Sequence, residues 1–167
     1  MRKEVQADPE EGTSYQLIWQ AEPSVEVSYF DDEASGARFL VVVAEDAGAA
    51  RATGERLESG LDTWRVDDLV AAVDDAENPV ELARAVLRAG VGAPEEPDER
   101  FLSRITRAMR HEDERVRETA IWAATYVPRP QYRSALIEVR DHDDSDELRE
   151  LAEITLESYD DANVPRP

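Results

Sequence analysis

Apolar and polar residues alternate along the first part of the chain. Tyr15, Leu17 and Trp19 share one face at a period of two, and residues 25–30 repeat this alternation. Residues 38–44 are almost continuously apolar and rich in β-branched side chains. Alternation indicates strands with one covered face, and an unbroken apolar run indicates a strand covered on both faces. The pattern therefore predicts a short three-stranded antiparallel meander.

The period changes to that of a helix after the meander. Asp46 is placed to cap a first helix over residues 47–58. From residue 64 onward, apolar side chains recur at i, i+3, i+4 and i+7, which is typical of amphipathic helices. The stripes predict six further helices, around residues 64–75, 79–89, 98–110, 114–127, 132–139 and 148–159. These form three helix pairs of about 31 to 35 residues each, and a repeat of that length is typical of an α-solenoid.

The predicted fold class is therefore α+β, with a sheet and one helix followed by a solenoid. We expect a flexible tail over residues 1–12, the meander with its helix over 13–62, helical repeats over 63–161, and a second tail over 162–167. No apolar run approaches the roughly 18 residues that span a bilayer. The first residues lead into further charged positions and not into an apolar stretch, so we expect no signal peptide and a cytoplasmic protein.

Two loop-to-helix junctions share a motif. Residues 111–120 read HEDERVRETA and residues 142–152 read HDDSDELRELA, so each has an acidic loop, a branched apolar residue followed by Arg, and Ala three residues later. This motif resembles the HEAT-repeat (armadillo-type) family of helical solenoids, over residues 64–160. The first pair departs from the motif because Glu81 stands at the Arg position. The positions that carry the resemblance are Asp113, Val116, Arg117 and Ala120, and Asp144, Leu148, Arg149 and Ala152.

The resemblance implies a scaffold that binds other macromolecules through a curved surface, without catalysis. It also implies ion pairs between the loop Asp of one repeat and the helix Arg of its neighbour. The expected pairs of this structural ladder are Asp113 with Arg149 and Asp144 with Arg117.

An apolar ridge is predicted on the second helices of the three pairs. Val86, Trp122 and Ile154 each lie six residues after the first apolar residue of their helix, and so about 120° around it. If the pairs stack, these side chains form a line along one flank. One interpretation is a protein-binding ridge with Trp122 as its main contact. The other is a widened core, because solenoid helices touch several neighbours.

The loops between the paired helices are acidic, and stacking would gather them along one edge. Such an edge could attract a basic partner, mainly by steering its approach. The other interpretation is helix capping and solvation, since helix N-termini favour negative charge. The candidate partner-binding residues at this edge are Glu112, Asp113, Asp143 and Asp144.

Composition bears on the partner more than on the fold. The chain has 167 residues, 39 acidic and 19 basic, and a formal net charge of −20. This charge repels phosphate backbones and anionic membrane surfaces, so we expect neither nucleic acid nor a membrane as partner. It is compatible with a basic protein partner or with mimicry of nucleic acid. It is equally compatible with life in high salt, because 18 of the basic residues are Arg and only Lys3 is Lys.

Catalytic chemistry has little support in the sequence. The chain has no Cys, no glycine-rich phosphate loop and no GxSxG or HExxH motif. His111 and His142 stand singly in separate loops without metal-ligand spacing, so we expect no metal and no cofactor. The leading hypothesis is a non-catalytic, acidic adaptor or inhibitor of a basic protein. The alternatives are a scaffold of a high-salt or GC-rich prokaryote whose acidity reflects its habitat, and an enzyme on a HEAT-like scaffold.

Overall fold

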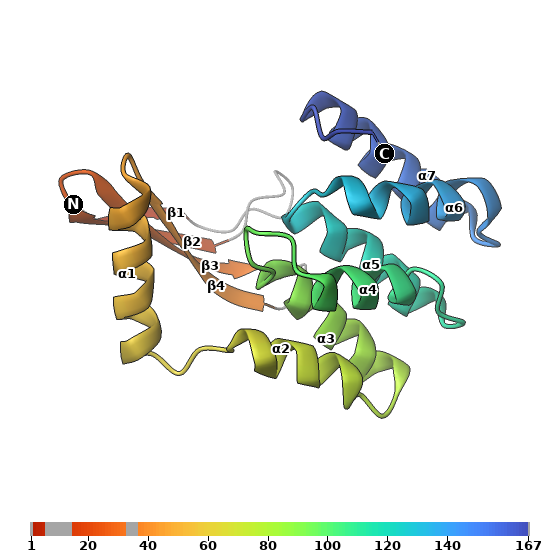
Figure 1. Ribbon diagram of the computed structural model, residues 1–167, viewed down its shortest axis with the longest axis horizontal. Coiled ribbons are helices and arrows are strands. Elements are labelled where there is room, and N and C mark those ends of the chain that lie inside the picture. Colours follow the sequence, from red (N-terminus) through yellow and green to blue (C-terminus); the bar gives the residue numbers. More distant parts are fainter. Residues whose placement is uncertain (1, 6–14, 33–36, 167) are drawn as a thin grey trace. The chain divides into compact units, whose positions relative to one another are not determined.

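A computed structural model of the chain describes residues 2–5, 15–32 and 37–166. It divides into two compact units, Met1–Thr63 and Trp64–Pro167. The first contains a sheet and one helix, and the second is entirely helical, as Figure 1 shows. The α+β class and the helical repeat region are therefore confirmed.

The sheet of the first unit has four strands in the order β1-β2-β3-β4, each antiparallel to its neighbour. The predicted meander corresponds to β2 (Tyr15–Glu22), β3 (Val25–Asp32) and β4 (Ala37–Ala44). The additional strand is β1 (Arg2–Val5), which pairs with β2. The prediction of a flexible tail is wrong for these four residues, because their backbone groups join the edge of the sheet, and residues 6–12 lie outside the described part. Helix α1 (Ala47–Gly60) begins at Asp46, whose side chain accepts a hydrogen bond from the Ala49 N–H.

The second unit consists of three helix pairs and a short 3-10 turn. The first helices of the pairs are α2 (Val66–Asp74), α4 (Glu99–Ala108) and α6 (Arg133–His142), the last preceded by η1 (Pro130–Tyr132). The second helices are α3 (Pro79–Val91), α5 (Glu114–Tyr126) and α7 (Asp146–Asp161). Helix α5 contacts both α3 and α7, so the second helices lie side by side in chain order (Figure 1).

Polar side chains begin each second helix in the same way. Asn78, Asp113 and Ser145 are the N-caps of α3, α5 and α7, and each accepts a hydrogen bond from a backbone N–H of the first turn. A cap satisfies donors that have no partner within the helix. These three residues therefore fix a common register for comparing the pairs.

One apolar core runs through all three pairs. Its fully buried members include Ile105 on α4, Ile121 on α5 and Leu136 on α6. The approach between α3 and α5 is closest at Gly90, where an added Cβ would lie 2.6 Å from the Cα of Ala123. A larger residue than glycine therefore fits at this crossing only if one of the two helices moves.

The C-terminal residues fold back onto the last pair. Val164 packs against the core, its N–H donates to the carbonyl of Tyr159, and its own carbonyl accepts from buried Arg133. The prediction of a free tail over residues 162–167 is therefore wrong for Val164, because its backbone and side chain close the end of the α6–α7 pair. Pro167 lies outside the described residues.

Candidate interaction surface

The predicted apolar ridge is present in part. Trp122 is 48% exposed and Ile154 is 55% exposed, and they lie on the neighbouring helices α5 and α7. Val86 is 0% exposed and belongs to the core, so its assignment to the ridge is wrong. Truncating Trp122 or Ile154 therefore leaves the fully buried core untouched, whereas truncating Val86 does not.

The N-caps explain the error at Val86. Trp122 and Ile154 both lie nine residues after their caps, Asp113 and Ser145. The residue nine positions after Asn78 is Leu87, which is half-buried. The first apolar residue of α3, Val80, lies two residues after its cap, whereas Val116 and Leu148 lie three residues after theirs. A position counted from Val80 is therefore one residue too early. We therefore define the ridge as Leu87, Trp122 and Ile154.

The expected ion pair between Asp144 and Arg117 is also wrong by one residue. The Arg117 guanidinium binds the carboxylate of Asp143, with Nε–Oδ2 at 2.7 Å and Nη2–Oδ1 at 2.9 Å. It does not bind Asp144, which precedes the cap by one residue and is exposed. The ladder acid therefore stands two residues before the cap, a position occupied by His111 in the second pair and Ala76 in the first.

The other expected ladder pair, Asp113 with Arg149, is also wrong. Asp113 accepts hydrogen bonds from the backbone N–H and the guanidinium of Arg115, which lower its pKa to about 2. Arg149 donates to the carbonyl of Asp143 and pairs with Asp146. In the first pair, Leu82 and not Glu81 stands at the register position of these arginines. Among the described residues, the Asp–Arg ladder therefore joins only the second and third pairs.

The Arg117–Asp143 pair is largely shielded from water. The side chains are 15% and 5% exposed, respectively. Burial would raise the pKa of Asp143, but the hydrogen bonds from Arg117 and the Ser145 N–H, with the nearby guanidinium charges, lower it below its ordinary value. Arg117 also donates to the carbonyls of His111 and Glu112 in its own loop. This pair therefore connects two repeats and is not available to a partner.

The predicted acidic edge separates into two groups. Asp113 and Asp143 are used within the fold, as cap and ladder residue. Glu112 and Asp144 each stand one residue before a cap and are exposed, and Glu77 occupies the same position in the first pair. The repeat thus places an exposed carboxylate directly before the cap in each of the three loops. Among the described residues, no group of three or more potential ligands is arranged to hold a metal ion.

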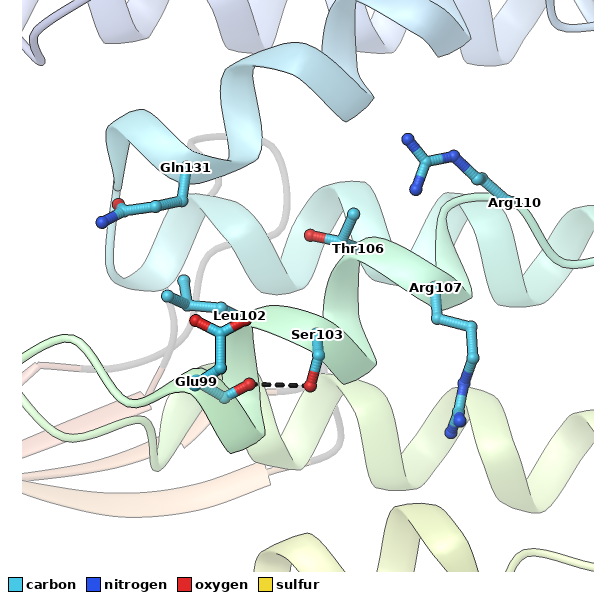
Figure 2. A pocket seen from close by; sticks show the side chains of 7 residues that line it. All are labelled: Glu99, Leu102, Ser103, Thr106, Arg107, Arg110 and Gln131. Carbon is cyan, nitrogen blue, oxygen red and sulfur yellow. Dashed lines mark hydrogen bonds between the residues drawn. The ribbon is translucent and has the colours of Figure 1, made fainter. Parts of the chain in front are cut away.

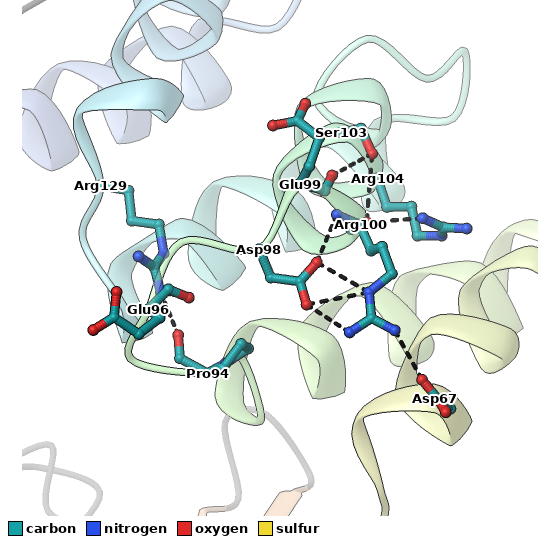
Figure 3. A network of polar contacts seen from close by, with 9 residues as sticks. All are labelled: Asp67, Pro94, Glu96, Asp98, Glu99, Arg100, Ser103, Arg104 and Arg129. Carbon is teal, nitrogen blue, oxygen red and sulfur yellow. Dashed lines mark hydrogen bonds and ion pairs between the residues drawn. The ribbon is translucent and has the colours of Figure 1, made fainter.

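A second network stabilises the opposite side of the solenoid. Asp98, the N-cap of α4, holds the guanidinium of Arg100, which also reaches Asp67 on α2 at 2.8 Å (Figure 3). Buried Arg129, which precedes η1, donates to the carbonyls of Pro94, Glu95 and Glu96 in the loop before α4. These cations are engaged in structural contacts. Sequence reasoning missed the contacts of Arg100 with Asp67 and of Arg129 with Pro94 because they join residues 33 and 35 positions apart.

A groove of about 320 Å³ lies between α4 and the start of the third pair. Figure 2 shows Ser103, Thr106 and Gln131 along it. The Ser103 hydroxyl donates to the carbonyl of Glu99 at 2.7 Å, so it is engaged with the helix backbone and not with a general base. The groove is open and lined by Leu102 and by polar side chains. It does not assemble the acid–base or nucleophile arrangement of a catalytic centre.

The chain belongs to the HEAT-repeat family: the model of HEAT repeats matches residues 66–157, which span α2 to α7. Proteins of this family are generally protein-interaction scaffolds and typically non-catalytic. Comparisons with curated proteins and with solved structures found no match. None of the described helices is long and apolar enough to cross a membrane.

Proposed function

We propose that the helical unit is a non-catalytic adaptor or inhibitor that holds a protein partner against the exposed face of α3, α5 and α7. The supporting observation is the ridge, where Trp122 and Ile154 are about half-exposed at equivalent positions on adjacent helices. Large, rigid aromatic side chains with apolar neighbours are common energetic centres of protein interfaces. Trp122 is the main contact in this proposal, and Ile154 and Leu87 extend it.

The partner is basic. Its approach is favoured by the net charge of −20 and by the exposed loop carboxylates Glu112 and Asp144. Charges at the rim of an interface act chiefly on the association rate and its salt dependence. Apolar contact at the ridge then sets how long the complex lasts. The protein works in the cytoplasm, without a cofactor, and its partner is neither nucleic acid nor a membrane.

Affinity capture with the full chain tests this proposal. The bait carries Trp122→Ala and Ile154→Ala together, and the matched control carries Ile137→Ala, an exposed apolar residue on α6. We expect basic proteins captured by the wild type to be lost with the double variant and kept with the control. Equal capture by all three baits would contradict the assignment of the ridge.

The loop carboxylates have their own test. Once a partner is purified, Glu112→Lys with Asp144→Lys should slow association by about tenfold at low salt and much less at 0.5 M salt, because screening shortens the reach of surface charges. Dissociation should change little. An association rate that does not depend on salt in the wild type would argue against a basic partner.

A further inference from the structure

The exposed stripes around the ridge differ in charge from one helix to the next. Residues at the register positions two, five and nine after the cap share one face of each helix, within an arc of about 60°. On α3 these positions hold Val80, Ala83 and Leu87, which are uncharged. The face of the first pair is therefore apolar.

The corresponding stripe on α5 is balanced. Arg115 and Glu118 precede Trp122, and Arg115 is held by Asp113 with Nη2–Oδ2 at 2.7 Å. The stripe on α7 is strongly acidic, because exposed carboxylates surround Ile154 on both sides along the helix. These residues are Glu147, Glu150, Glu157 and Asp161. At the three register positions the charge thus changes from none on α3, through one of each sign on α5, to two carboxylates on α7, where Glu157 and Asp161 extend the acidic stripe.

We propose that the ridge binds a helical segment of the partner in one orientation, with the basic end of the segment over α7 and an apolar, uncharged end over α3. This inference rests on the proposed function and adds the direction of the bound segment. Charge complementarity supports it: reversing the segment would place its cations over an uncharged surface and leave the carboxylates of α7 against apolar side chains.

The spacing of the ridge fits a helix. Packed helices lie about 8–10 Å apart, which is close to the rise of about 10.5 Å over seven residues of an α-helix. A helix of about 15 residues therefore places residues i, i+7 and i+14 over Leu87, Trp122 and Ile154. A helical segment also satisfies its own backbone groups. An extended segment would need hydrogen-bond donors for its carbonyls, and carboxylates provide none.

Orientation can be measured because the chain has no cysteine, so one introduced thiol is labelled specifically. Val80→Cys on α3 and Ser158→Cys on α7 give two singly labelled proteins, since both positions are exposed. The probes are two 15-residue amphipathic peptides with leucine at every seventh position. The first peptide carries three arginines in its last two turns, and the second carries three arginines in its first two turns. Each peptide has a nitroxide at the end that carries the arginines.

We expect the nitroxide to quench a fluorophore at position 158 and to leave position 80 nearly unchanged with both peptides, because charge and not chain direction decides the orientation. Replacing Glu150 and Glu157 by Lys should weaken binding about fivefold or more, since each exposed pair contributes tenths of a kcal/mol to about one. The matched control reverses Glu55 and Glu58, which are exposed on α1. It should change binding by less than about twofold.

The outcomes separate the two proposals. Binding that depends on Trp122 but quenches both positions equally would overturn the orientation and leave the proposed ridge in place. Peptide binding that survives Trp122→Ala with Ile154→Ala, or no binding to the wild type at all, would count against the ridge as a site for a basic segment. Peptides that bind without gaining helical circular dichroism would overturn the helical form of the segment.

Discussion

Gly90→Ala tests the close approach of α3 and α5. The new Cβ would lie 2.6 Å from the Cα and the carbonyl oxygen of Ala123, whereas ordinary contacts begin at 3.4 Å. Both of these atoms belong to the backbone, so one helix must move by about 0.8 Å, the difference between those distances. Such overpacking costs about 1–3 kcal/mol. Exchanging Gly for Ala within a helix gains about 0.5–1 kcal/mol.

The net expectation is a loss of about 1–2 kcal/mol in the free energy of unfolding of the helical unit. For a domain of about 100 residues this lowers Tm by roughly 5–10 °C. Thermal unfolding followed by circular dichroism at 222 nm, with calorimetry, measures it. Gly54→Ala is the matched control, because nothing lies within 4 Å of its added Cβ and only the gain in helix propensity remains.

A second variant examines the cause. Ala123→Gly removes the Cβ that would lie 2.7 Å from the new methyl group, but it leaves the Cα and carbonyl contacts in place. Combining it with Gly90→Ala should therefore not restore the wild-type Tm. A Tm of Gly90→Ala equal to or above that of the wild type would refute the reasoning, since helix propensity would then outweigh the contact.

Three further predictions concern the polar contacts and the charge. Asp143→Asn should cost about 3 kcal/mol at neutral pH because it leaves Arg117 without its buried partner. The pKa of Asp143 is lowered below its ordinary value of 3.8, so the ion pair stabilises the folded state fully above about pH 4 and less as the pH falls below that. In urea unfolding, the difference in free energy of unfolding between the variant and the wild type should therefore become smaller in acid. Tyr159→Phe removes a buried hydrogen bond of 2.6 Å to the carbonyl of Ala124 and should cost about 1–2 kcal/mol in the same assay. Added KCl screens repulsion among the carboxylates and should raise the Tm of the wild type. If the acidity serves a partner, this rise should end by about 0.5 M KCl, where screening is nearly complete. A rise that continues in molar KCl would instead favour adaptation of the protein to high salt.

The helices could be predicted from the sequence because each carries its own local signals. Asp46, Pro79 and Asp113 stand at helix starts, and the 3.6-residue period locates the buried faces. Strand β1 could not be predicted in this way. Its four residues are polar apart from Val5 and obtain their structure from pairing with β2, which lies more than ten residues further along the chain.

The candidate site was predictable only to within one residue of register. A shift of one position turns a helical side chain by about 100°, which is enough to exchange a buried residue for an exposed one. Val86 and Leu87 differ by that single step, as do the loop acids Asp143 and Asp144. The caps resolve both cases, since the loop before α7 contains one more residue between histidine and cap than the loop before α5. Counting from Asn78, Asp113 and Ser145 would have found Leu87 from the sequence.

The two junctions between repeats are chemically unlike, and this has a consequence for how the solenoid opens. The first combines the close fit of Gly90 against Ala123, which neither acid nor salt disturbs, with the Arg100–Asp67 and Arg104–Asp74 pairs, whose carboxylates are exposed and whose loss in acid therefore costs little. The second includes the Arg117–Asp143 pair and the Tyr159 hydroxyl, both of which are electrostatic in part. Local opening in acid should therefore begin at α6 and α7, and amide hydrogen exchange would show it there first. Because Ile154 lies on α7, a partner that spans the ridge would hold this pair closed, so binding and local stability are thermodynamically linked.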